Sequence, residues 1–393
     1  MRILFCNYEY PPLGGGGGVV NAALAEQLAQ RHEVTVLTSR AFDLPSRSIE
    51  NGVQVIRVPV FFRKRRASAN LASMFAYLPT AFWAGRGLLR RQRFDVINTH
   101  FVVPTGPVGY TLSGLSGVPN VLSVHGGDLY DPSKSLSPHR IPLLRIAVRH
   151  MVFAADAVVA QSSDTLSNLH RFFAPDAKAE IIPLGIPRPP RVDASRAKHD
   201  FTEDDILLIT VGRLVARKAV DQLIDSLAAL RDARVKLVVV GTGPLAETLM
   251  ARADSRGVRS QVRFVGGADE QTKLELLSIA DIFVSASQHE GFGLVFLEAM
   301  AAGLPVVCYD RGGQRDFLKD GETGFVVALN DHAGLTDRCR ELIASSERRK
   351  AMGRYNKDRA ERYFIDRCAE QYEILFESVI RRAPNAASQR RAI

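Results

Sequence analysis

The sequence predicts an α/β protein with two doubly wound parallel sheets, and three observations support this fold class. The chain of 393 residues is about two to three times the usual domain length of roughly 100–150 residues, so two domains are expected. Short β-branched and apolar runs alternate with longer helical patterns, which is typical of βαβ units. Because strands separated by helices cannot pair as hairpins, parallel sheets with helices on both faces follow.

The expected strands are the short apolar runs between the helical patterns. In the first half of the chain they lie at residues 3–6, 34–38, 53–58, 96–99, 120–124 and 157–160. In the second half they lie at residues 207–211, 236–240, 262–265, 282–285 and 306–309. Each half therefore has enough strands for a sheet of its own.

The boundary between the two domains is predicted within residues 183–190, because four prolines among these eight residues favour an extended linker. The first domain is then residues 1–185 and the second is residues 186–365. A final helix is expected over 366–382, where apolar residues at helical spacing form one face that must pack on another element. Those residues are Cys368, Tyr372, Leu375, Phe376 and Val379.

Composition excludes a disordered or fibrous chain, since 46% of the residues are hydrophobic and 24% are charged, as in ordinary globular enzymes. The four cysteines are scattered without a C-x-x-C pair, which favours a reducing compartment. The apolar run in the opening MRILFCNYEYPP is too short for a secretory signal. A cytoplasmic location is therefore expected.

Positive charge is concentrated in the first half, where residues 1–190 hold 20 Lys and Arg against 12 Asp and Glu, while the remainder holds 31 against 30. Part of the excess flanks an uncharged stretch of 19 residues, 67–85. The flanking residues are Arg63, Lys64, Arg65 and Arg66 before it and Arg86, Arg90, Arg91 and Arg93 after it.

Polar residues within the stretch, and Pro79, which is expected to interrupt a helix, argue against a span of the bilayer. Two interpretations stay open: a peripheral helix lying on an anionic membrane surface, at the inner face of the membrane, and a packed helix with a solvated basic face. Nucleic acid is not an expected partner, because no aromatic-interleaved basic stripe accompanies the charge.

Five consecutive glycines, Gly14 to Gly18, follow the first predicted strand and lead into a helix. Glycines at such a point let backbone N–H groups approach an anion or a sugar closely. The run lacks the last glycine of the dinucleotide fingerprint and the Lys-Ser/Thr of a P-loop, so neither a dinucleotide nor ATP is predicted here. A flexible loop is the alternative interpretation.

His125 directly follows the predicted strand 120–124, within VHGGD. Open α/β sheets bind ligands at the carboxyl ends of their strands, so a site role is predicted for His125, with a structural histidine as the alternative. Asp128 is either part of that site or the N-cap of the next element.

Arg213 and Lys218 lie in VGRLVARKA after the strand 207–211, with Arg217 between them. Two cations on one such loop form a clamp for a diphosphate, the guanidinium as a planar fork and the ammonium as a point charge. A solvated basic turn is the alternative.

The most specific signal is residues 285–307, SASQHEGFGLVFLEAMAAGLPVV, where a strand, a glycine loop and a helix follow one another. Glu290 opens the loop and Glu298 lies on the helix; both carboxylates can accept hydrogen bonds from sugar hydroxyls. The backbone N–H groups at the helix start would face an anion. The loop residues that follow Glu290 are Gly291, Phe292, Gly293 and Leu294.

One segment competes with this interpretation. Residues 241–246 match G-x-G-x-x-A after the strand 236–240, as in NAD(P)-dependent oxidoreductases. That pattern requires an acidic residue at the end of the next strand. Here the next strand ends Val265-Gly266-Gly267, without an acidic residue. We therefore interpret Gly241 and Gly243 as part of a loop that surrounds a nucleotide.

Together these residues resemble the retaining glycosyltransferases of family 4, which have the two-domain GT-B fold with a cleft between two Rossmann-like domains. The resemblance covers nearly the whole chain. Its motifs, in order, are PPLGGGGGVVN, VHGGD, VGRLVARK, VVGTGPL, VRFVGG and EGFGLVFLEAMAAGLPVV, with Glu290 and Glu298 forming its Glu-x7-Glu element.

The resemblance implies that the second domain binds a UDP- or GDP-linked sugar and the first a glycan, glycolipid or lipid-linked acceptor, as in polysaccharide or lipopolysaccharide biosynthesis. It also implies that the final helix returns to the first domain. Arg213 and Lys218 would hold the diphosphate, Glu290 the donor sugar and Glu298 the ribose. The remaining implied contacts are His125 beside the donor sugar, Gly15 and Gly16 near the diphosphate or acceptor, and Gly241 and Gly243 near the nucleoside.

Three further expectations concern the chemistry. The family usually has glycine where this chain has Ala219, which affects the expected backbone geometry more than the role of Lys218. Neither Asp-x-Asp, H-E-x-x-H nor a Cys/His cluster occurs in the sequence, so no metal or other cofactor is expected. Retention comes from the resemblance alone. A non-catalytic nucleotide-sugar binder and an NAD(P) oxidoreductase remain as alternatives.

Overall fold

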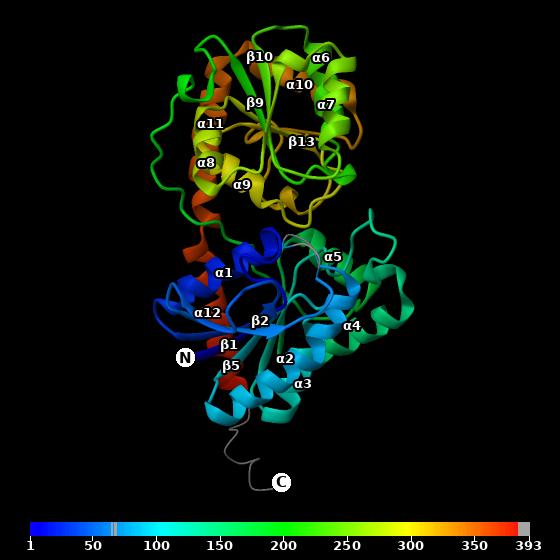
Figure 1. The fold of residues 1–393 in the computed structure, drawn as a ribbon, viewed down its shortest axis with the longest axis vertical. Coiled ribbons are helices and arrows are strands. Elements are labelled where there is room, and N and C mark those ends of the chain that lie inside the picture. Colours follow the sequence, from blue (N-terminus) through cyan, green and yellow to red (C-terminus); the bar gives the residue numbers. More distant parts are fainter. Residues whose placement is uncertain (64–65, 67–68, 384–393) are drawn as a thin grey trace. The chain divides into compact units, whose positions relative to one another are not determined.

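The computed structural model describes residues 1–63, 66 and 69–383, which form two compact units (Figure 1). Unit 1 comprises Met1–Pro187 together with the chain from Phe364 onward, and unit 2 is Arg188–Tyr363. The chain thus leaves unit 1 within the proline-rich segment and returns to it just before the last helix.

Unit 1 is built on an eight-stranded sheet with the order β3-β4-β2-β1-β5-β6-β7-β8. Strands β1, β5 and β6 are almost entirely buried, as expected for central strands with both faces covered. The strands are β1 (Arg2–Asn7), β2 (Glu33–Arg40), β3 (Arg47–Glu50), β4 (Val53–Pro59), β5 (Val96–His100), β6 (Asn120–Val124), β7 (Ala157–Ala160) and β8 (Glu180–Ile181).

The sheet of unit 1 is covered by helices from both parts of the unit. These are α1 (Gly16–Ala29), α2 (Leu71–Arg91), α3 (Gly106–Ser116), α4 (Pro142–Ala154), α5 (Ser163–Phe172) and α12 (Ile365–Arg382). Helix α12 packs on α1, and its side chains Tyr372 and Phe376 are fully buried in the same core as β1 and β2. Because each large apolar side chain contributes about 1.5–3 kcal/mol on burial, this last helix is an integral part of unit 1.

Unit 2 is built on a six-stranded sheet in which every pair is parallel, with the order β11-β10-β9-β12-β13-β14. This is the order 3-2-1-4-5-6 of Rossmann sheets. The strands are β9 (Ile206–Val211), β10 (Val235–Val240), β11 (Val262–Gly266), β12 (Ile282–Ser285), β13 (Val306–Tyr309) and β14 (Gly324–Val327).

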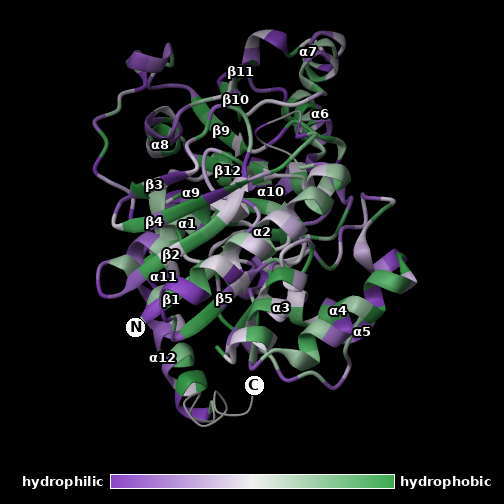
Figure 2. Ribbon diagram, turned by 60° about the horizontal axis from the view of Figure 1, so that its bottom comes forward, coloured by the Kyte–Doolittle hydropathy of each residue, from purple (hydrophilic) through white to green (hydrophobic). Residues whose placement is uncertain are grey.

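Six α-helices cover the sheet of unit 2. They are α6 (Val220–Leu230), α7 (Ala246–Ser255), α8 (Glu270–Ile279), α9 (Leu294–Ala302), α10 (His332–Ala344) and α11 (Ser346–Ala360). Side chains that accept a backbone N–H cap several of them, among them Asp269 at α8, Asp331 at α10 and Ser345 at α11. Figure 2 shows hydrophobic residues along the strands of the sheets, consistent with cores between sheet and helices.

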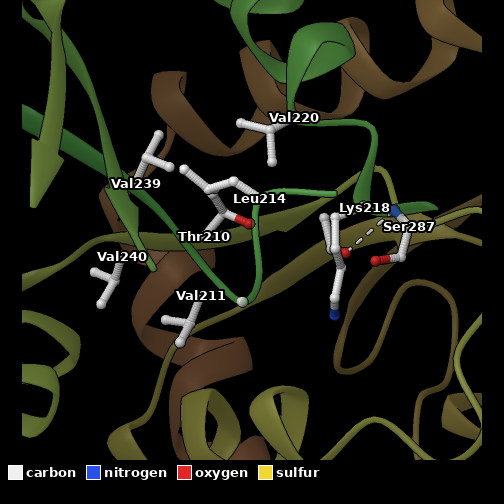
Figure 3. A pocket seen from close by; sticks show the side chains of 10 residues that line it. Thr210, Val211, Leu214, Lys218, Val220, Val239, Val240 and Ser287 are labelled. Atoms are coloured by element: carbon white, nitrogen blue, oxygen red, sulfur yellow. Dashed lines mark hydrogen bonds between the residues drawn. The ribbon is translucent and has the colours of Figure 1, made fainter. Parts of the chain in front are cut away.

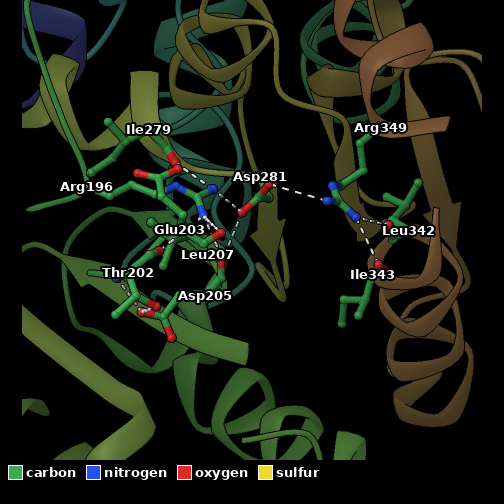
Figure 4. A network of polar contacts seen from close by, with 10 residues as sticks. All are labelled: Arg196, Thr202, Glu203, Asp205, Leu207, Ile279, Asp281, Leu342, Ile343 and Arg349. Carbon is green, nitrogen blue, oxygen red and sulfur yellow. Dashed lines mark hydrogen bonds and ion pairs between the residues drawn. The ribbon is translucent and has the colours of Figure 1, made fainter. Parts of the chain in front are cut away.

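A half-buried carboxylate, that of Asp281, joins the start of unit 2 to its last helices (Figure 4). Asp281 Oδ2 accepts from Arg196 Nη2 at 2.8 Å and from the Leu207 backbone N–H at 2.8 Å. Its other oxygen lies 3.5 Å from Arg349 Nη2, and Arg349 Nη1 also donates to the carbonyl of Leu342 at 2.7 Å. The segment before β9 is therefore fixed to the α10–α11 connection.

Three features differ from the expectations drawn from the sequence. Strand β3 pairs with β4 in an antiparallel manner, so one hairpin lies at the edge of the otherwise parallel sheet of unit 1. Helix α2 continues through Pro79 instead of breaking there, and begins with a capping box in which Asn70 and Ser73 exchange hydrogen bonds. Strands β3, β8 and β14 were not predicted: β3 and β8 are largely exposed, whereas β14 is a mostly buried apolar run of the same length as the predicted β12 and β13.

The uncharged stretch 67–85 lies mostly within α2, while Lys64, Arg65, Ala67 and Ser68 lie outside the described residues. Across the ranges that the structure covers, we find no helix with both the length and the hydrophobicity that crossing a membrane requires.

Candidate active site

The strand order of unit 2 reverses between β9 and β12, and open α/β sheets bind ligands at the carboxyl ends of strands at such a switch point. The loop after β9 carries Arg213, Arg217 and Lys218, and the loop after β12 carries Glu290. The parallel register therefore brings the predicted cationic loop and the predicted acidic loop to one edge of the sheet.

Glu290 is the centre of an ion cluster. Lys218 Nζ donates to Glu290 Oε1, and Arg217 Nη1 lies 3.4 Å from Glu290 Oε2 while also donating to the carbonyl of His289. The backbone of Glu290 is fixed by Gly313, whose N–H donates to its carbonyl at 2.9 Å. A Cβ at Gly312 would lie 2.1 Å from that carbonyl oxygen, so glycine is required there.

The cluster keeps Glu290 ionised although the side chain is buried. Burial alone would raise the pKa of this carboxyl, but the charges of Lys218 and Arg217 outweigh it and lower the pKa to about 2. A carboxylate that stays charged at neutral pH accepts hydrogen bonds and holds Lys218 in place. It is not a proton donor.

Arg213 lies on the same loop but is exposed, and within the described ranges its side chain forms no hydrogen bond or ion pair. Beside it is a small pocket at the carboxyl ends of β9, β10 and β12 (Figure 3). Lys218 and Ser287 are seen on one side of this pocket and Val239 and Val240 on the other. The lining residues are Thr210, Val211, Gly212, Leu214, Lys218, Val220, Val239, Val240, Ser285 and Ser287.

Helix α9 begins at Leu294, directly after Gly293, which adopts a left-handed backbone with φ 96° and provides no side-chain cap. No side chain among the described residues caps this helix start, where anion binding by the first N–H groups stays a prediction. Phe292, also among the predicted donor contacts, is 5% exposed, and its side chain packs against Phe317 with ring centroids 5.4 Å apart. Only the backbone of Phe292 is left to contact a ligand.

Glu298 lies on α9 and pairs with a residue that was not predicted from the sequence. Lys273 Nζ on α8 is 2.9 Å from Glu298 Oε1, while Glu298 Oε2 is buried and has no hydrogen-bond partner among the residues that the structure describes. Burial raises the pKa of Glu298, and Lys273 opposes that shift. The unpartnered oxygen is an acceptor suited to a ligand hydroxyl.

Gly241 and Gly243 have a packing reason that does not involve a ligand. A Cβ at Gly241 would lie 1.9 Å from the carbonyl oxygen of Gly212, and one at Gly243 would lie 2.2 Å from that of Leu214. The loop after β10 thus lies against the loop that carries the cations. These glycines let the two backbones touch, which is sufficient to explain the G-x-G spacing without a dinucleotide.

Ala219 occupies the position where glycine was expected, and it adopts the left-handed conformation that glycine favours, with φ 46° and ψ 44°. The backbone beside Lys218 therefore has the conformation expected for glycine, although this conformation strains an L-residue by about 1–2 kcal/mol.

Ala219→Gly is accordingly expected to leave the free energy of unfolding within about 0.5 kcal/mol of the wild type, because relief of the strain is offset by the unfolded-state entropy of glycine and by loss of a methyl group that is buried in the core. The melting temperature should therefore change by no more than about 2 °C. Ala216→Gly in the same turn is the matched control, because Ala216 is not among the residues with positive φ, and it should lower the melting temperature. Equal losses in both variants would contradict strain at Ala219.

In unit 1 the strand order reverses between β1 and β5, and His125 follows the neighbouring strand β6. Asp128 is not a helix cap: Oδ1 accepts from the His125 N–H at 2.8 Å and Oδ2 from the Val102 N–H at 2.6 Å. Burial raises the pKa of Asp128 to about 6. This carboxyl ties the loops after β5 and β6 together and fixes the backbone of His125.

The glycine run after β1 leads into α1, with Gly15 as the N-cap and Gly16 as the first helical residue. The N–H of Gly15 donates to Glu9 Oε2 at 3.2 Å, so this group is not available to an anion. A Cβ at Gly15 would meet nothing within 4 Å, whereas one at Gly17 would lie 2.6 Å from Cζ of Phe101. A side chain is therefore sterically excluded at Gly17 but not at Gly15.

Two side chains of unit 2 were not predicted to belong to the site. Arg217 lies between Arg213 and Lys218 in the sequence, but no role was predicted for it. Its position next to Lys218 could have indicated that it belongs to the same cationic loop. Lys273 had no signal, since a lysine on an ordinary amphipathic helix is usually solvated. Within the part of the chain that the structure covers, three or more His, Cys, Asp or Glu side chains nowhere gather as a metal site.

Two family sequence models match consecutive parts of the chain: Glycosyltransferase Family 4 at residues 14–188 and Glycosyl transferases group 1 at residues 191–359. The chain therefore belongs to glycosyltransferase family 4, and the resemblance found in the sequence is confirmed. The protein is a glycosyltransferase that uses a nucleotide-sugar donor.

Characterised relatives match along most of their length. N-acetyl-alpha-D-glucosaminyl L-malate synthase of Bacillus anthracis is 26% identical over 95% of this chain and 96% of its own. A GDP-mannose-dependent alpha-(1-6)-phosphatidylinositol monomannoside mannosyltransferase of Mycolicibacterium smegmatis is 28% identical over 89% of this chain and 91% of its own. Glycogen synthase of Mycobacterium tuberculosis is 30% identical over 90% of this chain and 89% of its own.

Solved structures show the same fold. Sucrose-phosphate synthase from Thermosynechococcus elongatus superposes with a TM-score of 0.84 at 22% identity, covering 96% of this chain and 99% of the other. Anabaena HepE, solved in complex with UDP and glucose, has a TM-score of 0.75 at 18% identity and covers 96% and 100% of the two chains. The predicted GT-B fold is confirmed.

Proposed function

We propose that the protein transfers a hexosyl group from a UDP- or GDP-linked sugar to a glycan, glycolipid or lipid-linked acceptor, with retention of the anomeric configuration and without a metal ion. The observation that carries this proposal is the cluster at the switch point of unit 2. There Lys218 and Arg217 surround Glu290, Arg213 has no partner within the described residues, and the uncapped start of α9 adds backbone donors.

In this proposal the cationic loop binds the diphosphate. The exposed guanidinium of Arg213 forms a planar fork for two phosphate oxygens. Lys218 stabilises the negative charge that develops on the leaving phosphate, and charge placed in advance at such a point usually contributes more to the rate enhancement than any other single effect. No metal ion is needed in this scheme, since the cations and the α9 N–H groups supply the positive charge.

Two carboxylates would select the donor. Glu290, kept ionised by its cationic neighbours, accepts hydrogen bonds from hydroxyls of the transferred sugar. Glu298 Oε2, which is buried and has no partner in the described part of the chain, accepts a hydrogen bond from a ribose hydroxyl. The family resemblance implies His125 as a further contact of the sugar, and the backbone from Gly291 to Leu294 would contact the phosphates.

Retention is proposed through attack on the same face from which the phosphate departs. The carboxylate most suited by position, Glu290, is already bound to Lys218, so a covalent glycosyl intermediate on it is not part of the proposal. The departing phosphate itself then accepts the proton of the acceptor hydroxyl. An inverted product would contradict this step.

Uracil or guanine is proposed as the base of the donor nucleotide, because two similar proteins are named or were solved with nucleotides that carry these bases. The mycobacterial mannosyltransferase is named as GDP-mannose-dependent, and HepE was solved with UDP. Both nucleotides share the diphosphate that Arg213 and Lys218 would bind.

Thermal shift tests the donor class directly. UDP or GDP at about 100 times its Kd is expected to stabilise the protein by roughly 2.7 kcal/mol, whereas ADP, NAD and NADP are not. Arg213→Ala and Glu298→Ala should lose most of this stabilisation. Lys350→Ala on α11, an exposed lysine, is the control and should keep it.

Other outcomes decide against the proposal. Stabilisation by NAD or NADP alone would identify residues 241–246 as the site of an oxidoreductase. Stabilisation by UDP or GDP in a protein that turns over no donor would identify a non-catalytic binder.

A lipid-linked acceptor requires a surface that approaches a membrane, and α2 offers one. Its exposed face carries Phe75 and Trp83, which are 68% and 65% exposed, and is followed by Arg86 and Arg90. Helix α4 likewise exposes Leu143 and Ile146 beside Arg145 and Arg149, and its ribbon carries both hydrophobic and hydrophilic colours in Figure 2. Apolar residues next to basic ones are typical of helices that lie on anionic lipid.

Binding to anionic vesicles is therefore expected at low salt and should weaken as salt is added. Because each basic residue near such a surface contributes about 1 kcal/mol, Arg86→Ala/Arg90→Ala should reduce vesicle partitioning roughly 10- to 30-fold in a sedimentation assay. Lys350→Ala/Arg354→Ala in unit 2 removes the same charge elsewhere and should change little. Equal partitioning to neutral and anionic vesicles would contradict membrane docking.

A further inference from the structure

Three consecutive strands of unit 1 deliver polar side chains to one point at their carboxyl ends. Strand β5 ends with His100, β6 is followed by His125, and β7 is followed by Gln161. His100 Nδ1 lies 2.9 Å from His125 Nε2, and Gln161 Nε2 lies 2.8 Å from the same nitrogen. Both histidines are buried. Of this group, only His125 was predicted from the sequence.

The direction of the hydrogen bonds can be followed from Asn98 to His125. Asn98 Nδ2 lies 2.8 Å from His100 Nε2, and Asn98 Oδ1 lies 3.5 Å from Ser123 Oγ, which is also 2.9 Å from the Tyr372 hydroxyl. An amide nitrogen only donates, so His100 Nε2 is an acceptor. The proton of neutral His100 is then on Nδ1, which donates to His125 Nε2.

His125 Nε2 is consequently an acceptor as well, and Gln161 Nε2 donates to it from the other side. The proton of neutral His125 is then on Nδ1, and within the described ranges no hydrogen-bond partner is found for that nitrogen. The buried network therefore leaves one N–H of His125 for a ligand.

The ring of His125 is held on its face as well as at its edge. Phe101 stacks on it with ring centroids 4.0 Å apart, and Phe101 has a left-handed backbone with φ 66°. A non-glycine residue in this conformation persists only where its surroundings enforce it. The enforcing contacts include Asp128, which binds the N–H of Val102, the next residue, at 2.6 Å.

We propose that His100 is a positioning residue for sugar transfer: together with Asn98 and Gln161 it holds His125 in the neutral Nδ1–H tautomer, so that His125 presents one fixed hydrogen-bond donor to an oxygen of the transferred sugar. This rests on the proposed function, which places His125 at the sugar. His100 itself does not touch the substrate. His100 acts by disfavouring the Nε2–H tautomer of His125.

The surroundings also oppose a charged imidazole at either position. Burial lowers the pKa of His100 to about 3, and burial together with His100 lowers the pKa of His125 well below its ordinary value. A second proton on His125 would point its Nε2–H at two donors. His125 therefore works as a neutral donor and not as a base.

Long-range ¹H–¹⁵N correlation on the histidine-labelled full chain tests the tautomer, with the His125 signals assigned by their loss in His125→Ala. Wild-type protein should show a protonated Nδ1 and an unprotonated Nε2 for His125. In His100→Leu, which keeps the volume but removes the donor, both tautomers should be populated. His100→Asn places an amide near the former Nδ1 and should restore the single tautomer.

Kinetics with a turned-over donor gives the second readout. Loss of an oriented donor at a reacting centre usually lowers kcat by about 10²–10³, so partial loss of the tautomer in His100→Leu should lower it roughly 10- to 100-fold, with nucleotide Kd unchanged. His100→Asn should recover most of the rate. His150→Leu on α4, an exposed histidine, is the matched control.

A protonated Nε2 on wild-type His125, or a His100→Leu protein with unchanged tautomer and unchanged kcat, would overturn the inference. If His125→Ala itself left kcat unchanged, the placement of His125 at the sugar would fail, and the catalytic part of this inference with it. The tautomer measurement judges the positioning by His100 separately.

Discussion

Replacing Lys218 with alanine is expected to lower kcat for sugar transfer by about 10²–10³-fold, because it removes a charge aimed at the departing phosphate. Lys218 lies on the loop after β9 and is oriented by Glu290, so its position is fixed before a donor arrives. That preorganisation is the physical reason for a large effect: no side chain has to be ordered during the reaction. Steady-state kinetics with the donor identified by thermal shift measures it.

The pattern of the loss is as informative as its size. An interaction made mainly in the transition state lowers kcat and kcat/KM together, whereas one made equally with the ground state raises KM alone. We expect the first pattern for Lys218→Ala, and Lys350→Ala should match the wild type. A change confined to KM would show that Lys218 only binds the donor.

Glu290→Gln is expected to be the second severe variant, with kcat reduced at least about 10²-fold. The substitution leaves the cations of Lys218 and Arg217 without their charged partner, and buried polar groups that lose a partner are costly. The amide keeps the shape of the side chain but loses the charge that pairs with Lys218 and Arg217. Breaking a buried ion pair of this kind should also lower stability by roughly 3 kcal/mol at pH 7.

The pH dependence of that stability loss has a definite sign. The pKa of Glu290 is lowered to about 2 in the folded protein from an ordinary value of 4.5, so its stabilising contribution is complete above about pH 4.5 and is lost as the pH falls toward 2. The difference in melting temperature between wild type and Glu290→Gln should therefore shrink across this range. A difference that stays constant down to pH 3 would contradict the ion cluster.

Much of the fold could be predicted because central strands of parallel sheets are continuous apolar runs. Every strand predicted from such a run is present, with ends shifted by a few residues at most. The pattern fails at the edges of the sheets: β3, RSIE, is polar and exposed, and β8 has two residues. These two edge strands bury little, so their sequences carry little of the signal, whereas the edge strand β14, GFVV, is mostly buried and was missed despite its apolar sequence.

The candidate site could be predicted where a residue type and a strand end coincide. Glu290 and Lys218 were found in this way, and the structure brings them together. His100 ends a predicted strand in the same manner as His125, but a second buried histidine becomes meaningful only when its distance to the first is known. The burial of Phe292 and the ion pair of Glu298 with Lys273 depend on packing between elements, which no local pattern encodes.

The most direct test of the central claim is a proton NMR time course of the full chain with α-linked UDP- and GDP-sugars in the presence of EDTA. We expect the nucleoside diphosphate to be released from one of these donors, with an α-configured sugar as the first product and with release by Lys218→Ala slower by about 10²–10³-fold. A β-configured first product would contradict retention, and turnover only after addition of a divalent metal would contradict a site in which Lys218, Arg213 and the start of α9 supply the positive charge.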